Sequence, residues 1–154
     1  MTRVEFIFNV EDKLAKAADL CEKTVAKGRQ LTFAAADSTL YPLLQDALWQ
    51  SSPSSFMPLF ALHDTQQRAA REDCPVHFFL HGAEGSDIKL MQDDVLIHFL
   101  QETPNYFSRF RYLVELVGSE EQDKVLARTR FKFYRERGYE IKTTDMAKNH
   151  HNLL

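Results

Sequence analysis

Residues 4–36 read VEFIFNVEDKLAKAADLCEKTVAKGRQLTFAAA, and this stretch decides the fold. Residues 4–10 are mostly β-branched or aromatic, which predicts a buried first strand. From Glu11 or Asp12 to Lys27 the apolar residues recur at helical spacing, and Gly28 ends the pattern as a helix stop. Residues 31–36 are again apolar and predict a second strand. Strand, helix and strand joined by short connections are typical of a parallel sheet.

The same alternation continues along the chain. Asp37 or Ser38 can cap a second helix, which carries leucines on one side and ends at Trp49. Further strands are expected at residues 75–80, 94–100, 111–117 and 139–142. We therefore expect an α/β fold, a three-layer α/β/α sandwich with a mostly parallel sheet and Rossmann-like topology. It forms a single domain over residues 1–144, followed by a flexible C-terminal tail at 145–154.

Composition limits the class of protein. The chain has 154 residues, of which 44% are hydrophobic and 27% charged, as expected for one globular domain. The net charge of −3 argues against a protein that coats nucleic acid with its whole surface. Only two cysteines occur, without metal spacing, so we expect free thiols and a cytoplasmic location. No signal peptide and no membrane-spanning run are expected.

Residues 124–139 read KVLARTRFKFYRERGY and predict a helix that closes at Gly138. At about 100° per residue, Leu126 and Phe133 point toward the core, with Ala127 and Tyr134 on one flank of that side. The outward face then carries a large aromatic ring among cations, namely Lys124, Arg128, Phe131, Lys132 and Arg135. This face is either a solvated basic surface with one stray ring or a docking site for an acidic peptide with an apolar end.

Residues 51–60 read SSPSSFMPLF and follow the second helix. Ser and Pro disfavour regular structure there, whereas the phenylalanines, Met and Leu are large and apolar. These side chains either plug the edge of the sheet or wait for a partner, since Trp and Phe anchors are common at interfaces. Residues 63–73 are polar, which predicts an exposed loop or a short helix.

Catalytic and cofactor motifs are missing from the sequence. No GxxxxGK[ST] or GxGxxG is present, and the first connection, NVEDK, is acidic where a phosphate needs bare N–H groups. His77 and His81 share one face of a predicted strand at about 13 Å, too far apart for one metal ion. We expect no cofactor, no metal and no catalytic residue. The rival hypotheses are a small nucleotide-binding enzyme or phosphotransferase on this scaffold, and direct single-strand binding through the basic helix.

Several segments, in this order and at this separation, resemble one family. They read DALWQSSPSSFMPL at 46–59, DVLIHF at 94–99, LVELV at 113–117 and DKVLARTRFKFYRERGYEI at 123–141. The chain resembles the chi subunit family of bacterial DNA polymerase III, accessory proteins of the clamp-loader complex. The resemblance covers nearly the whole chain, with residues 63–89 and the C-terminal tail matching least.

The resemblance implies a non-catalytic adaptor in DNA replication. Chi-like proteins bind the acidic C-terminal tail of single-stranded-DNA-binding protein, which ends in Phe with a free carboxylate. The matching positions here are Lys124, Arg128, Phe131 and Lys132, with Val117 nearby and Arg135 as a further cation. Arg128 would grip the terminal carboxylate, and Phe131 and Val117 would form the apolar surface for the terminal ring. The family often has Tyr where this chain has Phe131.

The resemblance also implies a second protein partner. Trp49, Phe56 and Pro58 match positions used for the psi subunit of the clamp loader, or for a helicase that competes for the same surface. Contact with nucleic acid would then be mainly indirect, through the coated single strand, and no membrane would be involved.

Overall fold

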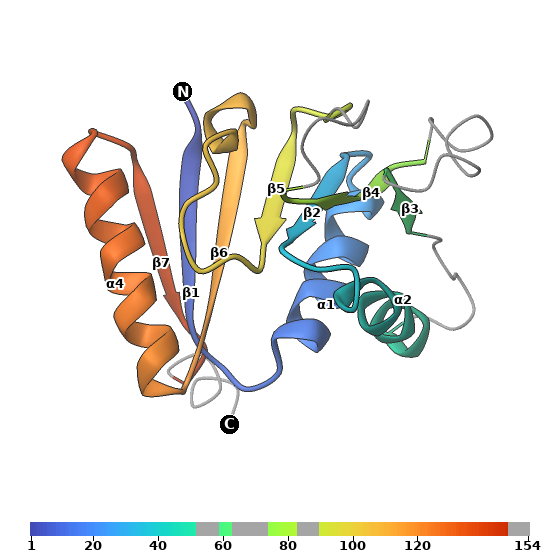
Figure 1. Cartoon of the computed structure of the whole chain (residues 1–154), viewed down its shortest axis with the longest axis horizontal. Coiled ribbons are helices and arrows are strands. Elements are labelled where there is room, and N and C mark those ends of the chain that lie inside the picture. The colour runs from blue at the N-terminus through green and yellow to red at the C-terminus, as the bar shows by residue number, and fades with distance from the viewer. Residues whose placement is uncertain (52–58, 63–73, 83–89, 148–154) are drawn as a thin grey trace.

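The computed structural model describes residues 1–51, 59–62, 74–82 and 90–147. Its centre is a seven-stranded, all-parallel sheet with the strand order β3-β4-β2-β5-β6-β1-β7 (Figure 1). In chain order the elements are β1 Arg3–Val10, α1 Lys13–Ala26, β2 Leu31–Ala35, α2 Leu40–Ser51, β3 Phe60–Ala61, β4 Val76–Leu80, β5 Val95–His98, the short 3-10 helix Phe107–Arg109, β6 Tyr112–Gly118, α4 Glu121–Glu136 and β7 Ile141–Asp145.

Helices cover both faces of this sheet. α1 and α2 pack on the face that contains Ile7 and Phe33, whereas α4 packs on the opposite face, which contains Phe6 and Val117. Neighbouring residues such as Phe6 and Ile7 enter different cores because side chains alternate across a strand. The predicted α/β class, with its parallel sheet between helical layers, is confirmed.

Local signals fix the helix ends. Asp12 caps α1 by accepting a hydrogen bond from the backbone N–H of Ala15 at 3.1 Å. Beyond α1 and α4, Gly28 and Gly138 adopt φ of 75° and 80°. In α4, Tyr139 N–H donates to Tyr134 O at 3.1 Å and Gly138 N–H donates to Arg135 O at 3.1 Å. This Schellman arrangement requires a left-handed residue, which glycine adopts without strain.

Two segments differ from the prediction. Leu59 and Phe60, expected in an irregular loop, are buried, and Phe60 begins the short strand β3 beside β4. These two residues therefore plug the sheet edge. The last strand runs over Ile141–Asp145 rather than 139–142, because it pairs with β1 through to the Phe8–Asp145 register. The predicted domain boundary after residue 144 thus falls inside β7. The polar segment 63–73 and the tail from residue 148 lie outside the described residues.

Two further expectations concern the cysteines and membrane-spanning helices. Cys21 is a free thiol, and Cys21 and Cys74 are both buried. Burial raises the pKa of the Cys21 thiol to about 12, so it stays protonated and unreactive at neutral pH. In the described ranges, no helix has the length and apolar character to cross a bilayer.

The aromatic core under α4 yields a first prediction. Phe6 is fully buried, with its ring centroid 5.2 Å from that of Phe131 and 5.9 Å from that of Tyr134. Phe6→Ala should lower the free energy of unfolding by about 3–5 kcal/mol, because it leaves a cavity beneath the helix. Urea denaturation measures this change. As the control, Met91→Ala at an exposed position should change stability by less than about 0.5 kcal/mol. Equal effects of the two substitutions would contradict this account of the core.

Candidate peptide-binding face of α4

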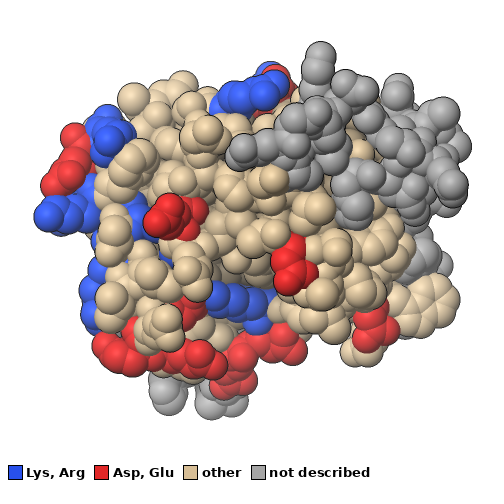
Figure 2. All heavy atoms as spheres, viewed as in Figure 1, with Lys and Arg blue, Asp and Glu red and all other residues tan. Residues whose placement is uncertain are grey.

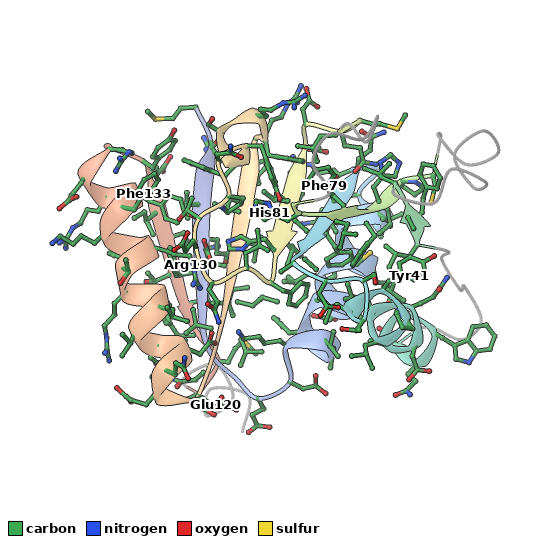
Figure 3. All side chains as sticks on the ribbon, in the orientation of Figure 1. Tyr41, Phe79, His81, Glu120, Arg130 and Phe133 are labelled. Carbon is green, nitrogen blue, oxygen red and sulfur yellow. The ribbon has the colours of Figure 1, made fainter. Side chains whose placement is uncertain are left out.

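The orientation of α4 decides which of its side chains a ligand can reach. Its buried stripe consists of Ala127, Arg130 and Tyr134. The predicted core side is rotated by part of a turn: Ala127 and Tyr134, expected on its flank, are buried, whereas Leu126 and Phe133 are only partly buried. The helix is rotated because Arg130, which a hydropathy pattern counts as outward-facing, is 5% exposed and points toward the sheet (Figure 3).

A buried carboxylate holds α4 in this orientation. Glu115 lies in the middle of β6 and is 1% exposed. Arg130 Nε donates to its Oε1 at 2.8 Å, and the Tyr134 hydroxyl donates to its Oε2 at 2.6 Å. His98 Nε2, from β5, lies 2.8 Å from the same Oε2. We call this set of four side chains the Glu115 network.

The network also holds the loop that follows β5. The backbone N–H of Leu100 donates to His98 Nδ1 at 3.1 Å, which leaves His98 Nε2 to donate to Glu115. Arg130 also donates to the carbonyl of Gln101 at 2.8 Å, and the Thr103 hydroxyl donates to that of Tyr134 at 3.2 Å. Sheet, helix and loop thus share one set of polar contacts.

The protonation of Glu115 follows from these contacts. Burial by itself would raise the pKa of Glu115, but its contacts with His98, Arg130 and Tyr134 outweigh burial and lower the pKa to about 2. The same surroundings raise the pKa of the Tyr134 hydroxyl, chiefly through burial and the nearby carboxylate. Glu115 is therefore ionised and Tyr134 is neutral across the physiological range.

The outer side of α4 carries the predicted cations. Arg128, Lys132 and Arg135 are exposed, and Lys124 is partly buried. Arg128 lies 3.7 Å from Glu121, and Lys132 lies 3.9 Å from Glu136, with all four side chains more than half exposed. Ion pairs of this kind are screened by solvent and contribute little. The cations can therefore exchange these partners for a ligand at small cost.

Phe131 lies at the border of this face, not in its middle. Its ring packs edge-to-face on Phe6 and is partly buried, while the guanidinium of Arg135 lies 6.0 Å from its centroid. Val117 is 0% exposed and belongs to the core beneath the helix, so it forms no part of the accessible surface. The large apolar side chain most exposed on α4 is instead Val125, at 50%, which is not among the predicted site residues. Val125 stands one helical turn before Arg128 and Thr129, and this spacing is the sequence signal that places it beside the cationic face.

The second predicted surface is partly described. Trp49 is 50% exposed near the end of α2, and Leu43 on the same helix is 52% exposed. Leu43 was not among the predicted residues. Phe56 and Pro58 lie outside the described residues.

The carboxyl ends of β1 and β6 are where a nucleotide would bind in a parallel α/β protein. Here the Asp123 carboxylate takes that place, accepting the backbone N–H of Gly118 at 2.6 Å and pairing with Lys13 Nζ at 2.7 Å. A hollow of about 420 Å³ remains, lined partly by the acids Glu11 and Glu120. This local charge opposes a phosphate, because the available N–H group is already bound to a carboxylate.

The histidines have separate surroundings. His98 belongs to the Glu115 network, His81 Nδ1 lies 3.1 Å from the Tyr106 hydroxyl, and the His77 ring contacts Phe60. Throughout the described ranges, no three His, Cys, Asp or Glu side chains are grouped so as to hold a metal ion.

The fold is similar to that of a solved structure with a very different sequence. The C-terminal domain of the DEAD-box protein Dbp5 superposes with a TM-score of 0.61, covering 95% of this chain and 91% of that one at 10% sequence identity. At this identity the likeness shows the fold alone. The chain is thus a parallel α/β protein whose distinctive surface is a cationic helix.

Sequence comparisons identify the family. The model of the DNA polymerase III chi subunit family, HolC, matches residues 1–142. The chi subunit of Pseudomonas aeruginosa is 30% identical over 145 residues, which cover 92% of this chain and 94% of that protein. The chi subunit of Escherichia coli is 28% identical, covering 75% and 74%, and that of Haemophilus influenzae is 26% identical, covering 67% and 66%. The chain belongs to the DNA polymerase III chi subunit family, accessory subunits of a replicative polymerase.

The Glu115 network gives the second prediction. A carboxyl group whose pKa is lowered on folding adds stability above its unfolded pKa, near 4.5, and loses that contribution as the pH falls toward 2. Glu115→Gln should lower the free energy of unfolding at pH 7 by about 3–5 kcal/mol, because it leaves Arg130 buried without a counter-charge. The difference from the parent chain should shrink between pH 4.5 and 2, measured by denaturant unfolding.

A paired substitution separates charge from packing. Glu115→Gln with Arg130→Met removes both charges but keeps an acceptor for Tyr134 and His98, and it should recover part of the loss at pH 7. If the double variant is as unstable as Glu115→Gln, or if the deficit of Glu115→Gln does not depend on pH, the ion pair is not what holds α4.

Proposed function

We propose that this chain is a non-catalytic adaptor of the clamp loader that binds the acidic, Phe-terminated tail of single-stranded-DNA-binding protein. The observation that carries the proposal is the outer face of α4, where exposed cations border a half-buried aromatic ring. An acidic peptide with an apolar end is complementary to such a face in both charge and polarity. The proposal needs no conformational change, because the Glu115 network holds the helix rigidly against the sheet.

Each side chain has a role in this proposal. The Arg128 guanidinium pairs with the terminal carboxylate, which a planar fork can hold with two hydrogen bonds. The accessible edge of Phe131 contacts the terminal ring, with Val117 supporting that edge from the core. Lys124, Lys132 and Arg135 attract the acidic residues that precede the ring, mainly speeding encounter. Because this chain has Phe131 where the family often has Tyr, the residue contacts the ligand only through its ring and donates no hydroxyl hydrogen bond.

The acidic carboxyl edge of the sheet favours an adaptor over the nucleotide-binding enzyme. Glu11, Glu120 and Asp123 surround the hollow where phosphates would sit in the rival proposal. We also propose that Trp49, with Phe56 and Pro58, binds the psi subunit or a competing helicase. The half-exposed Trp49 indole supports this second surface, since Trp is a frequent interface anchor.

The tail site predicts a specific pattern of affinities. An acidic peptide that ends in Phe should bind the protein, and the same peptide without its final Phe should bind at least tenfold more weakly. Arg128→Ala should weaken binding of the full peptide by about 1.5–3 kcal/mol, because it removes a hydrogen-bonded charge pair. Isothermal titration calorimetry measures both effects.

Arg137→Ala is the matched control. Arg137 is an exposed cation at the end of the same helix, but its guanidinium stacks on Phe133 at 3.6 Å, away from Phe131. Its removal should leave the affinity unchanged. Equal affinity for the two peptides, or equal losses for the two arginine variants, would reject the tail site.

The second surface predicts an independent loss. Trp49→Ala should abolish co-purification of psi, or weaken it by about 2 kcal/mol or more, while tail-peptide affinity stays the same. Leu40→Ala, at a partly buried position on α2, controls for damage to the helix. Retained psi binding by Trp49→Ala would exclude this residue from the interface.

A further inference from the structure

The fold separates the charges of the chain between the two ends of its strands. We call the side of the sheet where the strands begin the amino edge, and the side where they end the carboxyl edge. Because every strand is parallel, all amino ends lie at one edge and all carboxyl ends at the other. Among the described residues, the cations at the amino edge are Arg3, Lys27, Arg29, Arg109, Arg111, Arg135 and Arg137, and the acids there are Asp93, Asp94, Glu136 and Glu140. In the same part of the chain, the acids at the carboxyl edge are Glu11, Asp12, Asp37, Glu102, Glu120, Glu121, Asp123 and Asp145, opposed by Lys13 and Lys124.

Figure 2 shows this separation on one face. Acidic side chains follow the lower margin, where the carboxyl ends of β1 and β6 lie in Figure 1, and a basic group lies at the upper margin, near the amino ends. The basic side chains at the left margin lie over α4. A protein with a net charge of −3 thus presents a basic edge. That edge is distinct from the carboxyl ends, where a parallel α/β protein ordinarily binds ligands.

One hollow at the amino edge collects three of these arginines. Arg3, Arg29 and Arg111 line it together with Met1 and Tyr112, and its volume is about 460 Å³. The arginines come from separate segments of the chain. The backbone of Arg3 donates to the carbonyl of Arg111 at 2.9 Å, which holds the starts of β1 and β6 side by side.

One of the three arginines is fixed and two are available. Arg29 pairs with Asp94, and its guanidinium stacks 4.3 Å from the centroid of the Tyr112 ring. Arg3 pairs only loosely with Glu140, at 3.6 Å with side chains 66% and 77% exposed. The exposed Arg111 makes no side-chain hydrogen bond or ion pair with any described residue. Burial by itself would raise the pKa of Asp94, but the contacts with Arg29 and Gln30 and the charge of Arg111 together lower it.

We propose that this hollow binds the phosphate backbone of single-stranded nucleic acid. Guanidinium groups match phosphate oxygens in charge and geometry, and Arg3 and Arg111 can take up a phosphate without breaking a strong internal pair. The acidic carboxyl edge repels the same strand and so directs it to the amino edge. The proposal rests on the family's place in DNA replication and is independent of the tail site on α4.

The contact is weak and depends on salt. Arg3 and Arg111, with Arg29 behind them, can neutralise about two phosphates, so log K against log salt should have a slope of about −1.4 for a single strand. Such a contact holds no DNA by itself. It adds affinity once a protein partner has brought the strand close.

Fluorescence anisotropy of a labelled oligothymidylate with the full chain, over a salt series starting near 20 mM, tests the proposal. Arg3→Ala with Arg111→Ala should reduce affinity roughly tenfold at the lowest salt and bring the slope close to zero. Arg128→Ala should leave oligonucleotide binding unchanged while weakening the tail peptide. Lys23→Ala, which removes an exposed cation of α1 outside both sites, should also bind the oligonucleotide like the parent chain.

Three outcomes overturn the proposal. They are no oligonucleotide binding at low salt, binding that depends on Arg128 but not on Arg3 and Arg111, and equal losses for Lys23→Ala and the double variant. Binding of polyglutamate through Arg3 and Arg111 in place of the oligonucleotide would assign the hollow to an acidic protein. If the alanine double variant does not fold, Arg3→Glu and Arg111→Glu singly provide the same comparison, and tail-peptide affinity reports their folding.

Discussion

The ion pair between Glu115 and Arg130 is the interaction on which the arrangement of this protein depends. A carboxylate in the middle of a central strand is costly to bury, and the cost is offset by an arginine, a tyrosine and a histidine around it. Arg130 and Tyr134 come from one helix, so satisfying Glu115 also fixes the rotation of α4. That rotation turns Arg128 and Lys132 to solvent and sets Phe131 at the border with the core.

The resulting surface is more than a row of cations on a helix, because part of it is formed by the core beneath the helix. Three of its cations, Arg128, Lys132 and Arg135, are exposed. Its aromatic ring packs on Phe6, and Val117, which was expected to be accessible beside that ring, is in the core. A ligand therefore meets a shallow face with one fixed apolar border instead of a ring standing among charges. This geometry suits a flexible chain end, which can adapt to the face, better than a rigid ligand that needs a deep pocket.

Most of the fold could be predicted because its signals are local. Asp12 and Gly28 mark the ends of α1, and the strands have continuous apolar runs, so their positions came out within a few residues. β3 was missed because a strand formed by Phe60 and Ala61 is too short to show a period. The exposure of Arg128, Lys132 and Arg135 on α4 was predicted correctly, but the burial of Arg130 was not. A buried arginine is recognised only through its partner, and Glu115 within LVELV was the signal for it.

The sequence by itself determined the class of fold, the family and the cationic helix, because caps, apolar runs and family motifs are written in consecutive residues. Only the tertiary structure decided which side of α4 faces the sheet and which charges share an edge. Arg3, Arg29 and Arg111 are far apart along the chain and meet because parallel strands bring all their amino ends together. Proximity of this kind depends on strand order, which hydrophobic periodicity does not encode.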